Sequence, residues 1–361
     1  MNLPLYKNNQ APPTCPKEGH AGLWFERFFD QYTDKWEISD QKAVWLKDHF
    51  SNRRMGETPL LEKKVLQQMA LTNALKGKSQ VFKAAGYFVT GMGNAHPVEN
   101  GFSWHPTLGL PYLTGSAVKG LVHHWLEVWE DPDKERLLKW FGNASDPDYP
   151  IASGELIFFD ALPIEIATLK VDIMTPHMGN WYAQGDKIEN IEKDSDKIPA
   201  DWHNPVPIPF LVTDNLKLLF SFAPRTQQSN IDLDKVLDVL TNALDYLGAG
   251  AKTAAGYGQM EEDTQNTDYL SKILIKTATN LSDIERQLVE VAEMIEKEHC
   301  QHGGKIGLKI GNLLGQSTDW NNTDKHQLAD LMGQFYDKAG WGKGKKKTQR
   351  KNTIKTLRGE C

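Results

Sequence analysis

Residues 248–258 read GAGAKTAAGYG, with a Gly-x-Gly pair at each end. They follow residues 231–247, whose apolar spacing predicts an amphipathic helix. Glycine tolerates positive φ and lets another backbone approach closely, so paired glycines mark a place where something packs against bare main chain. Lys252, Thr253 and Tyr257 add a cation, a hydroxyl and an aromatic ring. Such a loop suits a phosphodiester backbone that carries a base to stack.

The Ala-Lys-Thr run in this loop resembles part of a nucleotide-binding P-loop. That motif needs glycine directly before its lysine and a second glycine five positions earlier, where this chain has Ala251 and Tyr246. A P-loop also runs strand, loop, helix, so that phosphate meets a helix N-terminus, whereas here the helix comes first. The P-loop interpretation is therefore excluded. A glycine-rich hairpin or bulge without a ligand stays open as an alternative.

The composition is that of an ordinary globular chain. It has 361 residues, 40% hydrophobic and 24% charged, which is enough for one large domain or two of ordinary size. The sequence has no run of 18 apolar residues and no basic-then-apolar leader, so we expect neither a membrane span nor a signal peptide. Three scattered cysteines (Cys15, Cys300 and Cys361) suit a reducing compartment, which predicts a cytoplasmic protein. His299-Cys300-Gln301-His302 has no second Cys/His pair near it, so no metal or cofactor is expected.

Charge is distributed unevenly along the chain. The net charge is −6, which by itself argues against a simple nucleic-acid binder. Residues 338–358, however, carry nine Lys or Arg and no acid. This stretch predicts a flexible basic tail that either contacts nucleic acid or stays solvated.

The predicted elements run strand, helix, two strands with a long excursion, strand, helix, strand, which approximates the order βαββαβ. Strands are expected at 81–90, 154–160, 164–174, 216–222 and 252–260. Helices are expected at 117–130 and 231–247. Pro163 is expected to break strand pairing between the second and third strands. The order is typical of a ferredoxin-like or RRM-like α+β fold.

Helical patterns flank this predicted core. Aromatic residues recur at helical spacing between 23 and 50, and Thr58-Pro59 starts a helix that ends near Gly77. Helical spacing returns at 269–277, 284–298 and 325–338. The expected regions are an N-terminal helical region (1–78), the core (79–262) with a long insertion (175–209), a C-terminal helical region (263–339) and the basic tail (340–361).

A second turn with anion-binding chemistry lies at residues 114–120. Ser116 is the expected N-cap of the helix that follows, and Gly115 precedes it. Lys119 in the first turn is mildly unfavourable for the helix dipole, which suggests that a bound anion offsets it. Free amides and one lysine together predict an anion site here.

These signals occur in the order found in the RAMP superfamily of CRISPR proteins. The run PYLTGSAVKG (111–120), the Phe141-Gly142 turn, the strand 154–160 and the two Gly-x-Gly pairs resemble that superfamily. Its hallmark is a glycine-rich loop after the last helix of a ferredoxin-like domain. DIMTPH (172–177) followed by Trp181-Tyr182, and PVPIPF (205–210), more narrowly resemble the sixth-subunit family of the type III-B Cmr effector complex. The family often has serine where Ala117 stands, and the N-terminal helices and basic tail have no counterpart in it.

The resemblance implies a non-catalytic structural subunit of an RNA-guided antiviral ribonucleoprotein. Such a subunit binds guide RNA near its 3′ end and the guide–target duplex, beside other RAMP backbone subunits and a small helical subunit. Sequence choice would then come from base pairing between guide RNA and target RNA. An excursion such as 175–209 typically inserts between nucleotides and displaces a base. The expected RNA contacts are Gly115, Ser116, Lys119, His177, Trp181, Gly250, Lys252, Thr253, Gly256 and Tyr257, with His177, Trp181 and Tyr257 as stacking groups.

Two other classes of function stay open. RAMP ribonucleases process guide RNA with a histidine as general base, and His105 and His177 in predicted loops are candidates. Asp172 and Asp186 have no feature that separates them from solvated carboxylates. The other class is a scaffold whose flanking helices dock neighbouring proteins. We expect no enzyme activity.

Overall fold

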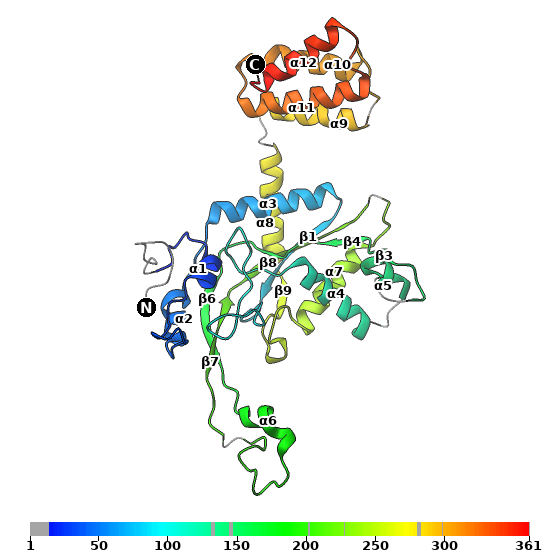
Figure 1. Ribbon diagram of the computed structural model, residues 1–361. Coiled ribbons are helices and arrows are strands. Elements are labelled where there is room, and N and C mark those ends of the chain that lie inside the picture. Colours follow the sequence, from blue (N-terminus) through cyan, green and yellow to red (C-terminus); the bar gives the residue numbers. More distant parts are fainter. Residues whose placement is uncertain are drawn as a thin grey trace. The chain divides into compact units, whose positions relative to one another are not determined.

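The computed structural model describes residues 14–130, 134–143, 147–200, 203–226, 228–279, 283–297 and 299–360. The chain divides into two compact units, Met1–Ser271 and Lys272–Cys361, and each has a hydrophobic core of its own (Figure 1). The division falls within one helix, α8 (Thr264–Thr279).

The first unit is built on an antiparallel sheet with the strand order β4-β8-β1-β9. Its strands are β4 (Leu156–Phe158), β8 (Lys217–Pro224), β1 (Lys78–Ala84) and β9 (Met260–Glu262), and β5 (Leu162–Pro163) also pairs with β8. In the register of the central strands, Phe82 of β1 lies opposite Leu218 of β8 on one side and Glu262 of β9 on the other. A small second sheet pairs β2 (Gly142–Asn143) with β3 (Ala152–Ser153).

Helices cover both faces of the main sheet. In chain order α4 (Gly115–Trp129) and α5 (Lys134–Phe141) lie between β1 and β4, and α7 (Leu233–Tyr246) lies between β8 and β9. Successive side chains of a strand point to opposite faces. Alternate residues of β8, including Phe220 and Phe222, enter the core under α4 and α7. On the other face Ser221 accepts a hydrogen bond from Gln68 of α3 (Thr58–Ala74). Covering both faces explains why six consecutive residues of β8 are buried.

A separate two-stranded ribbon forms the second core of this unit. Strands β6 (Thr168–Met174) and β7 (Ile208–Asp214) pair along their whole length. Two helices, α1 (Ala21–Arg27) and α2 (Lys42–Phe50), supply four of the buried aromatic side chains that pack with the ribbon: Trp24, Phe25, Trp45 and Phe50. Beyond its last pair, the ribbon carries α6 (Gly179–Gln184) and the turn η1 (Gly185–Lys187) (Figure 1). We call residues 175–207 the arm.

The second unit is helical. After the end of α8 it contains α9 (Asp283–Lys297), α10 (Lys305–Gln316), the turn η3 (Ser317–Asp319), α11 (Asn322–Ala339) and α12 (Lys345–Leu357). The basic stretch predicted to be a flexible tail is mostly α12, whose Ile354 and Leu357 are buried in this core. The prediction of flexibility was wrong because two apolar residues three positions apart are enough to dock a lysine-rich helix.

Three strand predictions need correction. The expected strand 81–90 ends at Ala84 in the main sheet, and Phe88 bridges Thr213 of the ribbon instead. The expected strand 252–260 begins only at Met260, because Lys252 and Gly256 adopt left-handed conformations. Pro163 does not break pairing, since it lies in the two-residue strand β5 beside β8. No helix within the described residues is long and apolar enough to cross a bilayer.

Candidate functional site

The glycine-rich loop adopts the left-handed backbone that its sequence predicts. Gly248, Gly250, Gly256 and Gly258 have φ of +72°, +93°, +85° and +73°. Lys252 is also left-handed, with φ of +59°. A side chain makes this conformation costly, so the glycines are needed for the path of the loop.

The chain's own backbone packs against two of these glycines. A Cβ on Gly250 would lie 2.2 Å from the carbonyl oxygen of Val89, and one on Gly258 would lie 1.9 Å from that of Ala249. Two main-chain hydrogen bonds, each 2.8 Å long, stabilise this contact: the amide of Ala251 donates to the carbonyl of Val89, and the amide of Gly258 donates to that of Tyr87. At these two positions the Cα side of the glycine therefore packs against the protein's own main chain. A Cβ on Gly256 would meet no atom within 4 Å, so this glycine faces open space.

A groove of about 530 Å³ runs along the outer side of this loop. Three parts of the chain line it: residues 90–93, residues 247–251 with Thr253, and Leu113 with one face of α4 that consists of Ala117, Leu121 and His124. Within the described residues, no hydrogen bond is donated by the amides of Met92, Gly93, Gly250, Lys252 and Thr253. Four of these amides belong to residues that line the groove, and backbone amides without a protein acceptor can donate to an anionic or carbonyl oxygen there.

Lys252 connects the groove to the ribbon. It stands between two lining residues, and its Nζ lies 5.4 Å from the ring centroid of Phe210 in β7 and 5.9 Å from that of Tyr257. Among the described residues no carboxylate pairs with it. Its charge is therefore held in place by two aromatic faces and remains available to an anion.

Tyr257 fastens the loop to β6. Its hydroxyl donates a 2.5 Å hydrogen bond to Oδ2 of Asp172, and its ring packs near those of Tyr87 and Phe210. Burial and the hydrogen bond to Asp172 raise the pKa of Tyr257 to about 12. The ring is half-buried and already in contact with protein, so its contribution is to hold the loop.

Stability should therefore fall at alkaline pH through Tyr257. The pKa is about 12 in the folded chain and near 10 when unfolded, so the unfolded chain loses this proton first and stability decreases as pH rises from 10 to 12. Tyr257→Phe should be less stable at pH 8, by about 1 kcal/mol, and should show a shallower loss between pH 10 and 12. Urea unfolding at each pH measures both. Parallel curves for the two proteins would contradict the assignment.

The predicted anion site at residues 114–120 is occupied from within the chain. The amide of Gly115 donates a 2.7 Å hydrogen bond to Oδ1 of Asp160, and Thr114, rather than Ser116, caps α4. The Oγ of Ser116 lies 3.0 Å from that of Thr114, and Nζ of Lys119 donates to the carbonyl of Phe141 at 2.8 Å. The anion that offsets the helix dipole is thus a carboxylate of the protein. None of the three predicted residues lines the groove.

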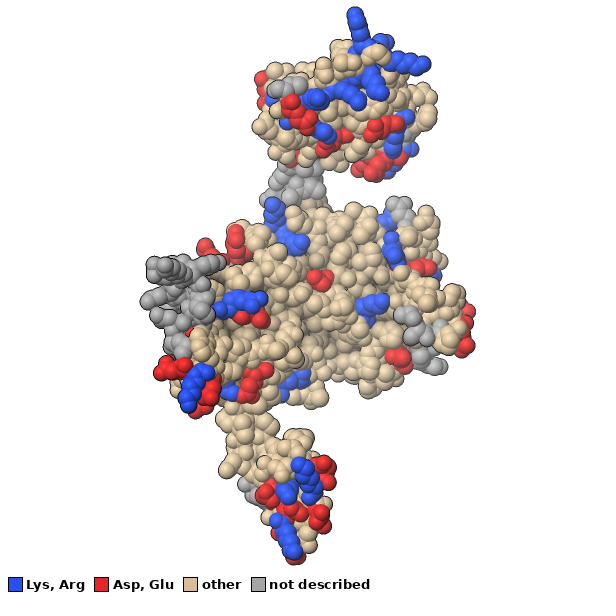
Figure 2. Space-filling view, in the orientation of Figure 1, with Lys and Arg blue, Asp and Glu red and all other residues tan. Residues whose placement is uncertain are grey.

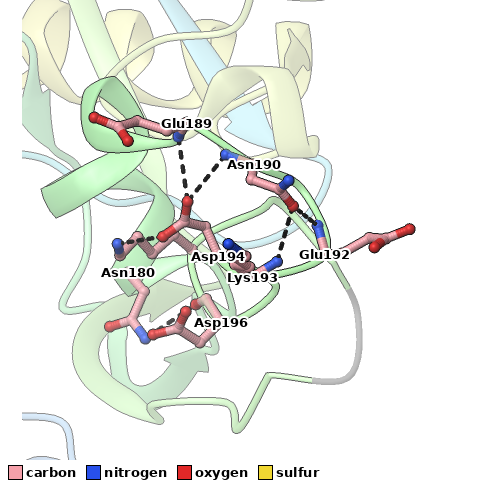
Figure 3. Close-up of polar contacts among 8 residues, drawn as sticks. Asn180, Glu189, Asn190, Glu192, Lys193, Asp194 and Asp196 are labelled. Carbon is pink, nitrogen blue, oxygen red and sulfur yellow. Dashed lines mark hydrogen bonds and ion pairs between the residues drawn. The ribbon is translucent and has the colours of Figure 1, made fainter.

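The remaining predicted residues, His177 and Trp181, lie on the arm. His177 is exposed, and Trp181 of α6 is 38% exposed with its ring against Gly185. The arm is organised by polar contacts, as Figure 3 shows: Oδ2 of Asp194 accepts from the amides of Glu189 and Asn190 at 3.2 and 3.1 Å. Oδ1 of Asp194 accepts from Lys197 at 2.6 Å. The excursion therefore has a defined fold without an apolar core.

Two of the candidate catalytic groups, His105 and Asp172, already form hydrogen bonds within the protein. His105 is buried, its Nδ1 accepts 3.3 Å hydrogen bonds from the amides of Thr107 and Leu108, and burial lowers its pKa. Asp172 is the acceptor for Tyr257. Within the described residues no group of three or more His, Cys, Asp or Glu side chains could hold a metal ion.

Sequence reasoning missed the far wall of the groove. Residues 90–93 and His124 line it, although none of them was expected to bind. The Gly91-Met92-Gly93 run was the available signal, since a second Gly-x-Gly in a loop has the same properties as the first.

The comparisons with known proteins each match about half of this chain or somewhat more. The family model described as RAMP superfamily matches residues 76–261. The CRISPR system Cmr subunit Cmr6 of Pyrococcus furiosus is 28% identical over 247 aligned positions, and the match covers 53% of this chain and 70% of that protein. The crystal structure of Cmr6 from Pyrococcus furiosus matches with a TM-score of 0.29 and 23% identity over 52% of this chain and 98% of that one. A chain of the cryo-EM structure of the type III-B Cmr-beta bound to cognate target RNA matches with a TM-score of 0.43 and 17% identity over 62% and 71%.

Proposed function

Because this chain belongs to the RAMP superfamily and is similar to a Cmr subunit, we propose that it is a structural subunit of a type III-B CRISPR effector complex. It would bind guide RNA near the 3′ end, and the guide–target duplex, in antiviral defence. Its neighbours would be other RAMP backbone subunits and a small helical subunit.

We infer a ferredoxin-like core from the order of elements in the first unit. In chain order these are β1, α4, β4, β8, α7 and β9, with both major helices packed on the same face of the sheet. The strand order β4-β8-β1-β9 and the antiparallel pairs agree with the βαββαβ plan. In that plan the glycine-rich loop connects the second helix to the last strand.

The observation that carries the proposal is the groove, four of whose lining residues have amides with no acceptor among the described residues, with Lys252 beside it. Amides that point into a concave surface bind phosphate oxygens without reading bases, and lysine adds a compact charge. We propose that Gly250, Lys252, Thr253 and Gly256 contact the RNA backbone together with residues 91–93. This combination suits a strand whose sequence is read by base pairing.

We propose that the arm works on the guide–target duplex. Its exposed His177 and partly exposed Trp181 are ring systems that can stack on a displaced base. The ribbon is paired to its last residues, Met174 and Ile208, so the arm begins from an ordered base.

We propose that the subunit has no nuclease activity of its own. The burial of His105 and its hydrogen bonds to the backbone support this, because a general base must reach the proton it removes. The alternative is an endoribonuclease that uses His177, which is exposed on the arm.

Lys252→Glu should weaken binding of single-stranded guide RNA on the order of tenfold at 0.1 M salt, because it replaces a phosphate-binding charge by a repulsive one. Lys119→Gln should change the affinity by less than about threefold, because its ammonium is bound to Phe141 and lies outside the groove. Fluorescence anisotropy with labelled guide RNA measures both.

Equal losses in the two variants would locate the contact elsewhere. The same mixtures, and mixtures with target RNA, should leave the RNA intact on denaturing gels. Site-specific cleavage by the native chain that disappears in His177→Ala would refute the non-catalytic proposal.

A further inference from the structure

The nine basic residues between 338 and 358 fall into two groups. Three are used inside the second unit. Lys338 donates to the carbonyl of Ile295 at 2.7 Å, Arg350 donates to that of Trp341 at 2.9 Å, and Arg358 pairs with Asp330 at 2.5 Å. The other six are all lysines and are exposed: Lys343, Lys345, Lys346, Lys347, Lys351 and Lys355. Among the described residues none of the six has an ion pair or a hydrogen bond through its ammonium, although Nζ of Lys351 lies 5.8 Å from the ring centroid of Trp341.

The internal group holds α12 firmly on α11. The guanidinium carbon of Arg350 lies 4.6 Å from the ring centroid of Tyr336 in α11, and Ile354 and Leu357 are buried on the same side. With one side of α12 fixed, its remaining side must face solvent. Figure 2 shows side chains of both signs on this unit, with lysine and arginine gathered at the end drawn at the top, whereas the visible face of the first unit has scattered charges of both signs.

Three of the six lysines form a row. Lys347, Lys351 and Lys355 are spaced four residues apart within α12, so they lie on one face, about 6 Å apart along the helix axis. Like charges at this spacing destabilise a helix. Three lysines also stand in the first turn of α12 without an acid, where they oppose the helix dipole. A bound polyanion would relieve both effects.

The composition of this face favours nucleic acid over protein. Protein interfaces are enriched in aromatic residues and arginine and depleted in lysine. Here the aromatic residues and Arg350 are turned inward, and lysine, threonine, asparagine and glutamine face outward. Lysine binds phosphate as a point charge and requires no particular base.

We propose that the exposed face of α12 is a second nucleic-acid binding surface, which contacts the phosphate backbone of RNA without sequence preference. It lies outside the range matched by the RAMP family model and shares no residue with the groove. It therefore does not depend on the function proposed for the first unit.

The test compares two triple variants of the full chain. One carries Lys347→Gln, Lys351→Gln and Lys355→Gln. The control carries Lys297→Gln, Lys305→Gln and Lys309→Gln, which remove the same charge from the same unit, where Lys297 and Lys309 already pair with Glu293 and Glu290. Glutamine and lysine have similar helix propensities, so both variants should fold, as circular dichroism and melting curves would verify.

Binding to a mixed-sequence single-stranded RNA is measured by anisotropy over a range of KCl concentrations. The row variant should lose affinity on the order of tenfold at 0.1 M KCl, and its slope of log K against log [KCl] should be smaller by about 2, for three lost contacts. The control should keep the native slope. Equal slopes in all three proteins would overturn the proposal, and so would a row variant that binds RNA normally but loses binding to polyglutamate. Lys252→Glu, assayed beside them, reports on the groove alone.

Discussion

Gly258→Ala should lower the free energy of unfolding of the first unit by about 3 kcal/mol or more. Alanine at a φ of +73° costs about 1–2 kcal/mol. The added methyl would also lie 1.9 Å from the carbonyl oxygen of Ala249, and overpacking of this kind costs about 1–3 kcal/mol. The contact cannot relax cheaply, because Ala249 and Gly258 are joined by a 2.8 Å hydrogen bond. Urea denaturation followed by tryptophan fluorescence measures the loss.

Gly256→Ala is the matched control for this prediction. Gly256 has a similar φ, +85°, but no atom within 4 Å of its added Cβ. Alanine at this position should lower the free energy of unfolding only by the cost of the left-handed backbone, about 1–2 kcal/mol. Similar losses at the two positions would mean that the loop does not press against itself at Gly258.

Removal of the arm should abolish base displacement and leave the first unit folded. Met174 and Ile208 are register partners, so replacing residues 175–207 by Asn-Gly closes the ribbon as a two-residue hairpin. The described hydrogen bonds of the arm are internal to it, and none of its described residues is buried. The melting temperature should therefore change little.

The functional loss is measured in the complex reconstituted with its other subunits. A 2-aminopurine base in the guide–target duplex brightens when it is unstacked. A scan of positions should find one that brightens with the native subunit and stays dark with the shortened one. Affinity for guide RNA should stay within about threefold, because the groove is intact. The same bright position in both complexes would contradict the assignment to the arm.

The sequence was informative where the cause of a structure is local. Positive φ at the paired glycines, the helix before them and the α+β pattern all follow from neighbouring residues. The residue that packs against the loop could not be predicted in this way, because Val89 lies far earlier in the chain and only the fold brings it to Gly250. The partners of Lys119 and of Gly115 could not be predicted for the same reason. The carbonyl of Phe141 accepts from Lys119, and the carboxylate of Asp160 accepts from the amide of Gly115. Both acceptors come from segments outside the turn, so the sequence of the turn alone cannot predict them.

Helix α12 shows a second limit of sequence reasoning. A run of lysines predicts a solvated segment. Whether the segment docks as a helix depends instead on Ile354, Leu357 and Arg350, whose partners lie on α11 and in the segment after it. Composition alone cannot reveal that such a helix has somewhere to dock.

The hydrogen bond between Tyr257 and Asp172 joins the glycine-rich loop to the strand that leads into the arm. Tyr257 belongs to the loop that forms one wall of the groove, and Asp172 belongs to the strand from which the arm departs. With Lys252 resting on Phe210 of the other strand, the loop is attached to both strands at their shared root. A load on the arm would therefore reach the glycine-rich loop through this hydrogen bond, and a ligand in the groove would stiffen the start of the arm. By thermodynamic linkage, if a ligand in the groove changes the affinity of the arm for its ligand by some factor, the ligand of the arm changes the affinity of the groove by the same factor.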